Sequence, residues 1–188
     1  MKIREAKKED APLLASVIIW AVGDEITGSF AGENHTRNDV HDLFTSLAER
    51  EDSQYSYKNS LIAVDDNGEP MGAIIGYDGA RLHELRKAFF EAAETRLGYH
   101  LEGEIADETS PDEFYLDSLA VLEKYRGHGI ASALLNAMSE RAASIGKPAG
   151  LLVDKINPRA RKLYERVGFT FIDERPFAGV LMDHLQRK

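Results

Sequence analysis

The feature that most constrains the fold is the stretch FYLDSLAVLEKYRGHGIASALL, residues 114–135. Its first eight residues are apolar on both alternating faces except for Asp117 and Ser118, which is typical of a central strand covered on both sides. Two glycines then precede a segment whose apolar residues have helical spacing. A strand, a glycine-containing loop and a helix in this order predict an α/β fold, with a right-handed crossover to a parallel strand.

The chain before residue 114 predicts a strand, two helices and a hairpin. The start alternates as a strand does, and Asp10 followed by Pro12 marks the beginning of a helix. Glycines and polar residues over 23–40 predict a loop that contains Glu25, before a second helix over 40–50. Asn67-Gly68 separates two β-rich runs, which is the strongest short signal for a hairpin.

The later segments complete a mixed sheet. Residues 81–97 carry a helical apolar stripe, and residues 101–114 then contain six acids and no Lys or Arg, which predicts an exposed acidic loop. AGLLVD predicts a strand parallel to 114–121, NPRARKLYERVG a helix, and FTFIDE and GVLMDHL two closing strands. The expected class is α/β, with a mixed central sheet of about six to seven strands flanked by helices.

Length and composition exclude several classes. A chain of 188 residues predicts a single domain over 1–188. Without cysteine there is no disulfide, thiolate metal site or cysteine nucleophile, and we find neither a signal peptide nor a run of about 18 apolar residues, so we expect a cytoplasmic protein. The net charge of −9 disfavours nucleic-acid and membrane partners, and the histidine spacing predicts no metal site.

The glycine loop permits several interpretations. Unpaired amides at a helix N-terminus bind anions, and Arg126, Gly127 and Gly129 suit a phosphate there. A turn that merely caps the helix is one alternative. A dinucleotide fingerprint is another, because Gly127, Gly129 and Ser132 approximate G-x-G-x-x-G/A and Asp154 ends a strand about 20 residues later. That alternative implies a nicotinamide oxidoreductase.

Two motifs resemble those of the GNAT superfamily of N-acetyltransferases. Arg126-x-x-Gly129-x-Ala131 is similar to the R/Q-x-x-G-x-G/A core of its acetyl-CoA pyrophosphate motif. The downstream NPRARKLYERVGF carries the recurring Asn, Tyr and Gly-Phe of the superfamily at Asn157, Tyr164, Gly168 and Phe169. The resemblance is close over 114–172 and extends in outline to the N-terminal elements. It implies a GNAT fold, from which the inserted helix and acidic loop between the third and fourth strands depart.

The resemblance also implies which residues bind acetyl-CoA. The backbone of Leu119, Ala120 and Val121 is expected to bind the pantetheine arm. The amides of residues 126–132 are expected to bind the pyrophosphate, and for His128 the backbone amide is expected to be more useful than the ring. The full set is Leu119, Ala120, Val121, Arg126, Gly127, His128, Gly129, Ile130, Ala131, Ser132, Asn157 and Tyr164.

Catalysis requires a group that deprotonates the amine and one that protonates the departing thiolate. Tyr164 aligns with the tyrosine that serves as general acid in the family, whereas packing is its alternative role. Asp117 is the candidate base or amine anchor, because a carboxylate in an apolar strand is costly unless it is paired or used, and a satisfied structural carboxylate is its alternative role. Glu25 and Tyr77 are candidate substrate-binding residues, with a solvated surface and core packing as their respective alternatives.

The expected function is therefore N-acetylation of a primary amine by direct attack in a ternary complex, with acetyl-CoA as donor and no metal. The alternative is a catalytically inactive acyl-CoA-binding module or sensor with the same fold. The acidic insertion and the net charge favour a polyamine, an aminoglycoside-like molecule or a basic peptide as acceptor, while metabolite amines and protein N-termini remain open. Relatives often dimerise through C-terminal strands, so FAGVLMDHL suggests a homodimer.

Overall fold

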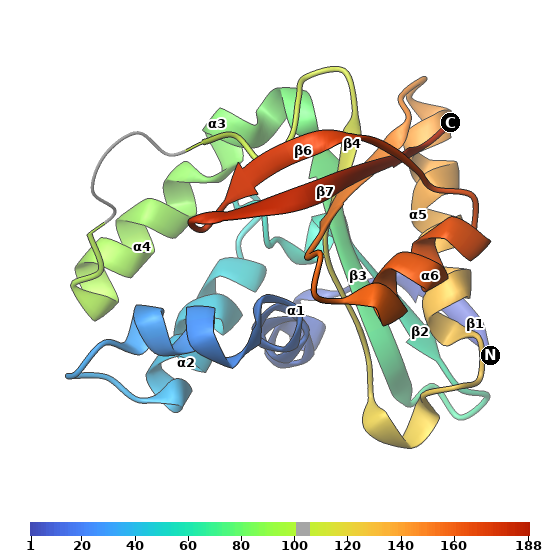
Figure 1. The fold of residues 1–188 in the computed structure, drawn as a ribbon. Helices are drawn as coiled ribbons and strands as arrows, with labels where there is room; N and C mark the ends of the chain where they lie inside the picture. Colours follow the sequence, from blue (N-terminus) through green and yellow to red (C-terminus); the bar gives the residue numbers. More distant parts are fainter. Residues whose placement is uncertain (101–105) are drawn as a thin grey trace.

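A mixed sheet with strand order β1-β2-β3-β4-β5-β7-β6 forms the centre of the computed structural model, which describes residues 1–100 and 106–188 (Figure 1). The strands are β1 (Lys2–Glu5), β2 (Ser60–Val64), β3 (Pro70–Asp78), β4 (Phe114–Val121), β5 (Ala149–Val153), β6 (Thr170–Phe177) and β7 (Val180–Arg187). Among the strands of the described residues, only β4 and β5 pair in parallel. This confirms the α/β class, the mixed sheet and the expected parallel pair.

Helices cover both faces of the sheet. They are α1 (Ala11–Ala31), α2 (Arg37–Ala48), α3 (Leu82–Leu85), α4 (Lys87–Leu97), α5 (Ile130–Ser144) and α6 (Pro158–Arg166). In β2, Ile62 and Val64 pack with α1, α2 and α4, whereas Leu61 and Ala63 pack with α5, because successive strand residues point to opposite faces.

The expected loop over 23–40 is wrong for residues 24–31, which continue α1 beyond a break at Gly23. Gly23 has φ 82° and ψ 174°, so the helix restarts in a new direction. Phe30 then lies edge-on to Phe44 of α2 and Phe89 of α4, with ring centroids 5.9 and 5.5 Å apart. Burial of that aromatic ring stabilises a helix that local propensity alone disfavours. Glu25 consequently lies on a helix and not in a loop.

The expected exposed acidic loop is also wrong over part of its length. Residues 101–105 lie outside the described residues, but Glu108 and Glu113 are buried, the latter fully. Their carboxylates find tyrosine, arginine and histidine partners from distant strands and helices, which a count of local charges does not reveal. The acids of this segment therefore belong to the interior as well as to the surface.

One helical stretch, residues 8–31, is long and apolar enough to cross a membrane by length and composition alone. Polar residues interrupt the stretch, so it holds no continuous apolar run, but its mean hydropathy stays high. In the fold, Leu14, Val17 and Ile18 are fully buried in the core beneath α2. The break at Gly23 divides the stretch into two shorter helical pieces.

Candidate functional site

Strands β4 and β5 separate after a short parallel contact. The described pairing consists of Phe114 with Ala149 and Tyr115 with Gly150, while on its other side β4 stays paired with β3 as far as Val121. Alternate backbone groups of a strand point to opposite neighbours. The side of β4 that faces β5 therefore offers backbone N–H and C=O groups over 116–121, the part that contains Leu119 and Ala120.

The N-terminus of α5 follows after a 3-10 turn (Glu123–Tyr125) and the glycine loop, and the space beside its two glycines is open. Gly129 is its N-cap with φ 78°, and Gly127 has φ 83°, with open space beside both Cα atoms. The first backbone hydrogen bond runs from the Ala133 amide to the Gly129 carbonyl at 3.0 Å. The amides of Ile130, Ala131 and Ser132 precede it and have no intrahelical acceptor. They carry the positive end of the helix dipole, which attracts an anion.

The side chains of Arg126 and His128 bind the loop itself. Arg126 Nε donates to the Val121 carbonyl at 3.2 Å, and His128 Nδ1 lies 2.9 Å from the Arg126 carbonyl. Both residues are exposed. These contacts fix the course of the loop, and the role of the His128 backbone in binding a ligand stays a prediction.

Helix α6 carries the two other motif residues. Asn157 is its N-cap, and its Oδ1 accepts a hydrogen bond from the Ala160 amide at 3.1 Å. Tyr164 is partly buried against Phe169, and it packs with the cluster that holds Leu119 of β4 and Val153 of β5. Burial raises the pKa of Tyr164 to about 12. Its phenol is therefore protonated at neutral pH and can donate a proton near the separated strands.

Asp117 occupies a β-bulge in β4. Ile75 of β3 pairs with Ser118 and the next residue, Gly76, pairs with Leu116, so Asp117 is the additional residue between them. Its Oδ1 accepts from Ser118 Oγ at 2.7 Å and its Oδ2 from Gln54 Nε2 at 3.4 Å. Burial, helped by the nearby Glu108 carboxylate, raises the pKa of Asp117 to about 7. This carboxylate can therefore bind and release a proton near neutral pH.

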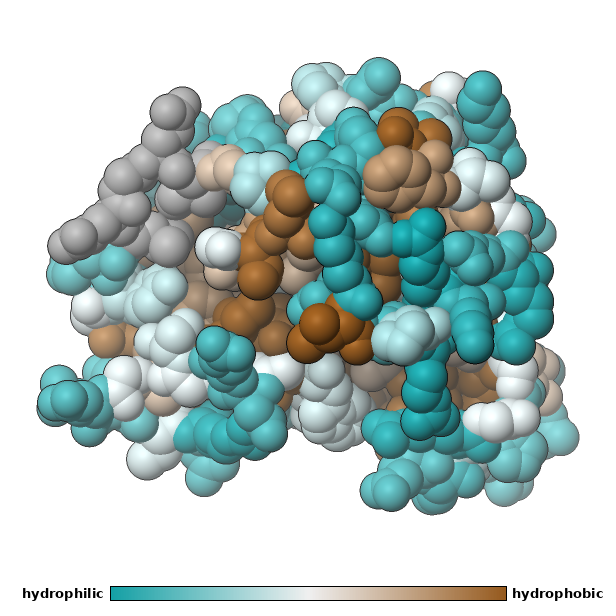
Figure 2. Space-filling model, viewed as in Figure 1, coloured by the Kyte–Doolittle hydropathy of each residue, from teal (hydrophilic) through white to brown (hydrophobic). Residues whose placement is uncertain are grey.

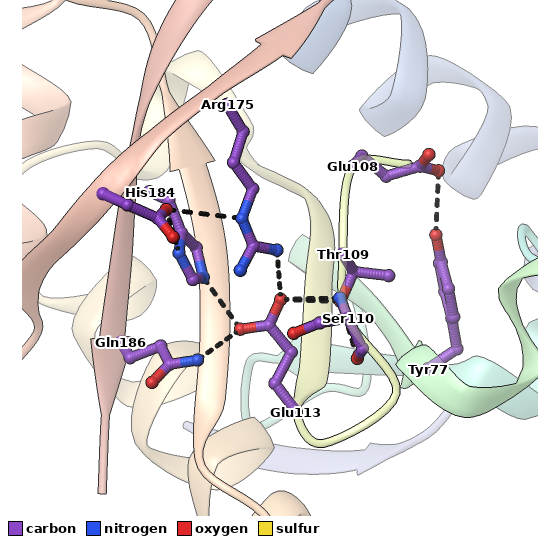
Figure 3. Close-up of polar contacts among 9 residues, drawn as sticks. Tyr77, Glu108, Thr109, Ser110, Glu113, Arg175, His184 and Gln186 are labelled. Carbon is purple, nitrogen blue, oxygen red and sulfur yellow. Dashed lines mark hydrogen bonds and ion pairs between the residues drawn. The ribbon is translucent and has the colours of Figure 1, made fainter. Parts of the chain in front are cut away.

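Tyr77 and Glu25 lie in contrasting environments. Tyr77 on β3 is 2% exposed, and its hydroxyl donates to Glu108 Oε1 at 3.1 Å (Figure 3). Its ring lies edge-on to Tyr115, 5.7 Å between centroids, so it has the packing role that the sequence allows. Glu25 is exposed on α1 and forms no ion pair with the described residues. Burial and the nearby Glu108 and Asp117 carboxylates raise the pKa of Tyr77, so Tyr77 lies close to Asp117, whereas no described hydrogen bond or ion pair joins Glu25 to Asp117.

Three residues near Asp117 or its strand were not predicted from the sequence. Gln54 donates a hydrogen bond to Asp117, the Glu108 carboxylate lies near Asp117, and Glu113 immediately precedes β4. Glu113 Oε2 accepts from His184 and Gln186 at 2.8 and 2.7 Å, and Oε1 accepts from Thr109 and Arg175 at 2.7 and 2.9 Å (Figure 3). Despite burial, these hydrogen bonds, led by that of His184, lower its pKa to about 2. Glu113 is therefore a fixed negative charge that joins β4 to β6 and β7.

The glycine at position 150 explains how this carboxylate fits. A Cβ atom there would lie 2.1 Å from Glu113 Oε2, which is closer than any side chain tolerates. Gly150 pairs with Tyr115 at the closed end of the β4–β5 ladder. No local sequence pattern marks Gly150 or Glu113. Their partners are distant in the sequence, so the cluster is visible only in the folded structure.

Among the described residues, no group of three or more His, Asp or Glu side chains is arranged to hold a metal ion. The expected absence of a metal remains a prediction.

Comparison with known proteins supports the same family as the motifs. The model of the acetyltransferase (GNAT) family matches residues 25–169. An acetyltransferase of Agrobacterium fabrum strain C58 is 34% identical over 99 residues, which cover 53% of this chain and 72% of the relative. A crystal structure of an acetyltransferase is 30% identical, with a TM-score of 0.79 and coverage of 100% of this chain and 99% of its own. A Staphylococcus aureus Mu50 N-acetyltransferase shares the fold, at 24% identity, TM-score 0.80 and coverage of 99% and 100%.

Proposed function

The chain belongs to the GNAT acetyltransferase family, and on that premise we propose that it transfers the acetyl group of acetyl-CoA to a primary amine. The observation that supports this best is the combination of the open β4–β5 gap with the free N-terminus of α5. Asp117 lies on the same strand as that gap, with a pKa of about 7. A donor site and a proton acceptor therefore meet along one strand.

The residues around the gap suit acetyl-CoA. We assign the pantetheine arm to the backbone of Leu119, Ala120 and Val121, and the pyrophosphate to the amides of residues 126–132. Positive φ and open space at Gly127 and Gly129 support this fit, because they leave the backbone accessible. Asn157 contributes by capping the helix that carries Tyr164.

Proton transfer is the task of two side chains. Acetyl-CoA supplies the thioester, whose C–S bond breaks as the C–N bond to the acceptor forms. The Asp117 carboxylate takes one proton from the acceptor ammonium and passes it to solvent, since an alkylamine is protonated at neutral pH. The Tyr164 phenol gives its proton to the departing sulfur and regains one, through solvent, from the acylated nitrogen. The products are the amide, CoA thiol and one released proton. With no cysteine in the chain, we propose direct transfer between the bound substrates.

Three further assignments accompany this proposal. We treat residues 1–188 as one domain, because both core clusters lie against the same sheet. We assign the protein to the cytoplasm, without membrane or nucleic-acid partners, on the basis of its acidity and lack of cysteine. The expected edge at FAGVLMDHL is wrong, because β7 lies between β5 and β6, and β6 is the edge strand at this end of the sheet. A homodimer through the β6–β7 hairpin is supported by Phe171, Ile172, Val180 and Leu181, which lie toward its two ends and are each about half exposed. Figure 2 shows apolar surface along part of this hairpin.

Thermal unfolding separates the candidate functions. A ligand at about 100 times its Kd stabilises the folded state by about 2.7 kcal/mol, which raises the thermal midpoint by several degrees. We expect a rise with acetyl-CoA or desulfo-CoA and none with NADH. A rise with NADH alone would instead support the oxidoreductase.

Turnover separates the enzyme from an acyl-CoA-binding module. We expect CoA thiol release when primary amines are added, and loss of that release in Tyr164→Phe. Binding of acetyl-CoA without any amine-dependent thiol release would favour the module.

A further inference from the structure

Gln54 contacts the candidate base and carries a buried hydrogen-bond acceptor that has no partner among the described residues. It lies between α2 and β2, is 4% exposed, and its backbone carbonyl accepts from Asn59 Nδ2 at 3.2 Å. Its side-chain Nε2 donates to Asp117 Oδ2 at 3.4 Å. Its Oε1 is buried and has no hydrogen-bond partner among the described residues. Because a buried carbonyl without a donor costs free energy, this atom requires an explanation.

The surroundings of Gln54 favour a cationic donor. Asp117 and Glu108 are two carboxylates in the same buried region, and Arg86 is the cation nearest to Glu108, at 3.7 Å. Arg86 already pairs with Asp107 at 2.9 Å, so Asp107 and Glu108 share one guanidinium, and no described ion pair joins Arg86 to Asp117. Arg86 Nη1 is also buried without a hydrogen-bond partner among the described residues, but it lies on the Glu108 side of the region. The phenols of Tyr55, Tyr77 and Tyr115 complete this region. An ammonium group supplies the positive charge and the N–H donors that Asp117 and Gln54 Oε1 lack.

We propose that Gln54 is a substrate-positioning residue, whose Oε1 accepts an N–H of the acceptor ammonium while the Asp117 carboxylate accepts another. This inference rests on the proposed function, in which Asp117 receives the proton. Once that proton has left, the amide carbonyl still holds an N–H of the neutral amine. Gln54 thereby fixes the orientation of the nitrogen, and its own Nε2 fixes the carboxylate. A bound water that merely fills the same position is the competing explanation.

The decisive variant is Gln54→Met, which keeps the length of the side chain and removes both polar atoms. The substitution also leaves Asp117 Oδ2 without the Nε2 donor, so we expect the thermal midpoint to fall by a few degrees, and the kinetics are compared below the unfolding temperature of the variant. Gln186→Met is the matched control, because it removes a glutamine hydrogen bond from Glu113, outside the proposed site. The probe is 1,4-diaminobutane, with 1,4-butanediol as its uncharged counterpart.

In Gln54→Met, we expect KM for 1,4-diaminobutane to rise roughly 10- to 100-fold, the effect of one hydrogen bond to a charged group, with an unchanged Kd for acetyl-CoA. The acidic limb of kcat/KM should move to higher pH, because burial and the nearby Glu108 carboxylate raise the pKa of Asp117 and the hydrogen bond from Gln54 opposes them. The other titratable groups near Asp117 are the phenols of Tyr55, Tyr77 and Tyr115. Gln186→Met should retain the wild-type KM and pH profile below its unfolding temperature.

Unchanged KM and pH profile in Gln54→Met, with Asp117→Asn inactive, would overturn this role for Gln54 and leave the proposed function intact. If the wild type shows no turnover with the diamine, isothermal titration calorimetry of diamine binding to the acetyl-CoA-loaded proteins tests the role of Gln54. Diamine binding that is lost in Gln54→Met and kept in Gln186→Met supports the role even though the proposed function fails. Equal binding in all three proteins, equal binding of the diol, or no binding at all overturns it.

Discussion

At the scale of single residues, the side-chain pKa values of Glu113 and Asp117 shift in opposite directions, although the two residues are only four positions apart in the sequence. Glu113 is fully buried and receives donors from His184, Gln186 and Arg175, whereas Asp117 is partly exposed and, among the described residues, receives those of Ser118 and Gln54 alone. The pKa of the first is therefore lowered to about 2 and that of the second raised to about 7. Only the second can exchange protons at neutral pH, which is why Asp117 is the candidate base.

Asp117→Asn should increase stability at alkaline pH. The folded-state pKa of about 7 exceeds the ordinary value of 3.8, so the stability linked to this group is present below about pH 4 and is lost as the pH rises through 7. An asparagine carries no charge to be buried at pH 8. We expect the thermal midpoint of the variant to exceed that of the wild type by several degrees at pH 8 and to approach it at pH 4. Parallel midpoint curves over this range would contradict the assigned environment.

Tyr164→Phe tests the proposed acid. Removal of a general acid typically lowers turnover by at least about 100-fold, and we expect such a fall in kcat with little change in KM for acetyl-CoA. Because the pKa of Tyr164 is about 12, the wild type should show no alkaline loss of activity from this group below about pH 10. Steady-state kinetics on both proteins provide the measurement, and a variant with wild-type kcat would restrict Tyr164 to packing.

At the scale of elements, three parts of the fold position the proposed site. They are the bulge in β4, the glycine loop before α5, and the Glu113 cluster at the closed end of the β4–β5 pair. The bulge turns Asp117 out of the regular β3–β4 register. Gly127 and Gly129 expose the start of α5. The Glu113 cluster attaches the β6–β7 hairpin beside Gly150, where the two parallel strands still meet. The gap between the strands therefore begins at a rigid point.

Glu113→Gln should weaken this point without touching the proposed chemistry. An amide nitrogen in place of Oε2 would face the donors of His184 and Gln186, and disruption of a buried ion pair costs about 3–5 kcal/mol. The stability from Glu113 is present above about pH 4.5 and is lost as the pH falls through 2, so the deficit of the variant should shrink in strong acid. Urea unfolding measures it, with the exposed Glu140→Gln on α5 as control. An equal effect of both substitutions would contradict the structural role.

The elements nearest to the glycine loop were predictable because their signals are local. Apolar alternation over 114–121, two glycines and helical spacing after Ile130 lie within one short segment. The helix after Gly23 and the burial of Glu113 were not predictable in this way. Phe30 is stabilised by rings on α2 and α4, and Glu113 by side chains 71 and 73 positions away. Gln54 carries no pattern, and its position next to Asp117 depends on the fold alone.

At the scale of the whole molecule, the net charge of −9 creates a field that attracts cations. With a cationic acceptor, this field should raise the rate of encounter at low ionic strength. We expect kcat/KM for 1,4-diaminobutane to fall several-fold between about 0.01 and 0.3 M salt, because the Debye length shortens from about 30 Å to less than 10 Å. Initial rates at saturating acetyl-CoA measure the effect. A value of kcat/KM that is independent of salt would show that the acidic surface serves no such steering.

The central claim is the transfer of acetyl from acetyl-CoA to the nitrogen of a primary amine. Its most direct test is a carbon NMR time course with carbonyl-¹³C acetyl-CoA, the protein, and a mixture of primary amines that includes 1,4-diaminobutane. We predict that the thioester resonance is replaced by an amide resonance in the wild type, and far more slowly in Asp117→Asn. If the label remains in the thioester, or appears only as free acetate, the chain is not the N-acetyltransferase proposed here.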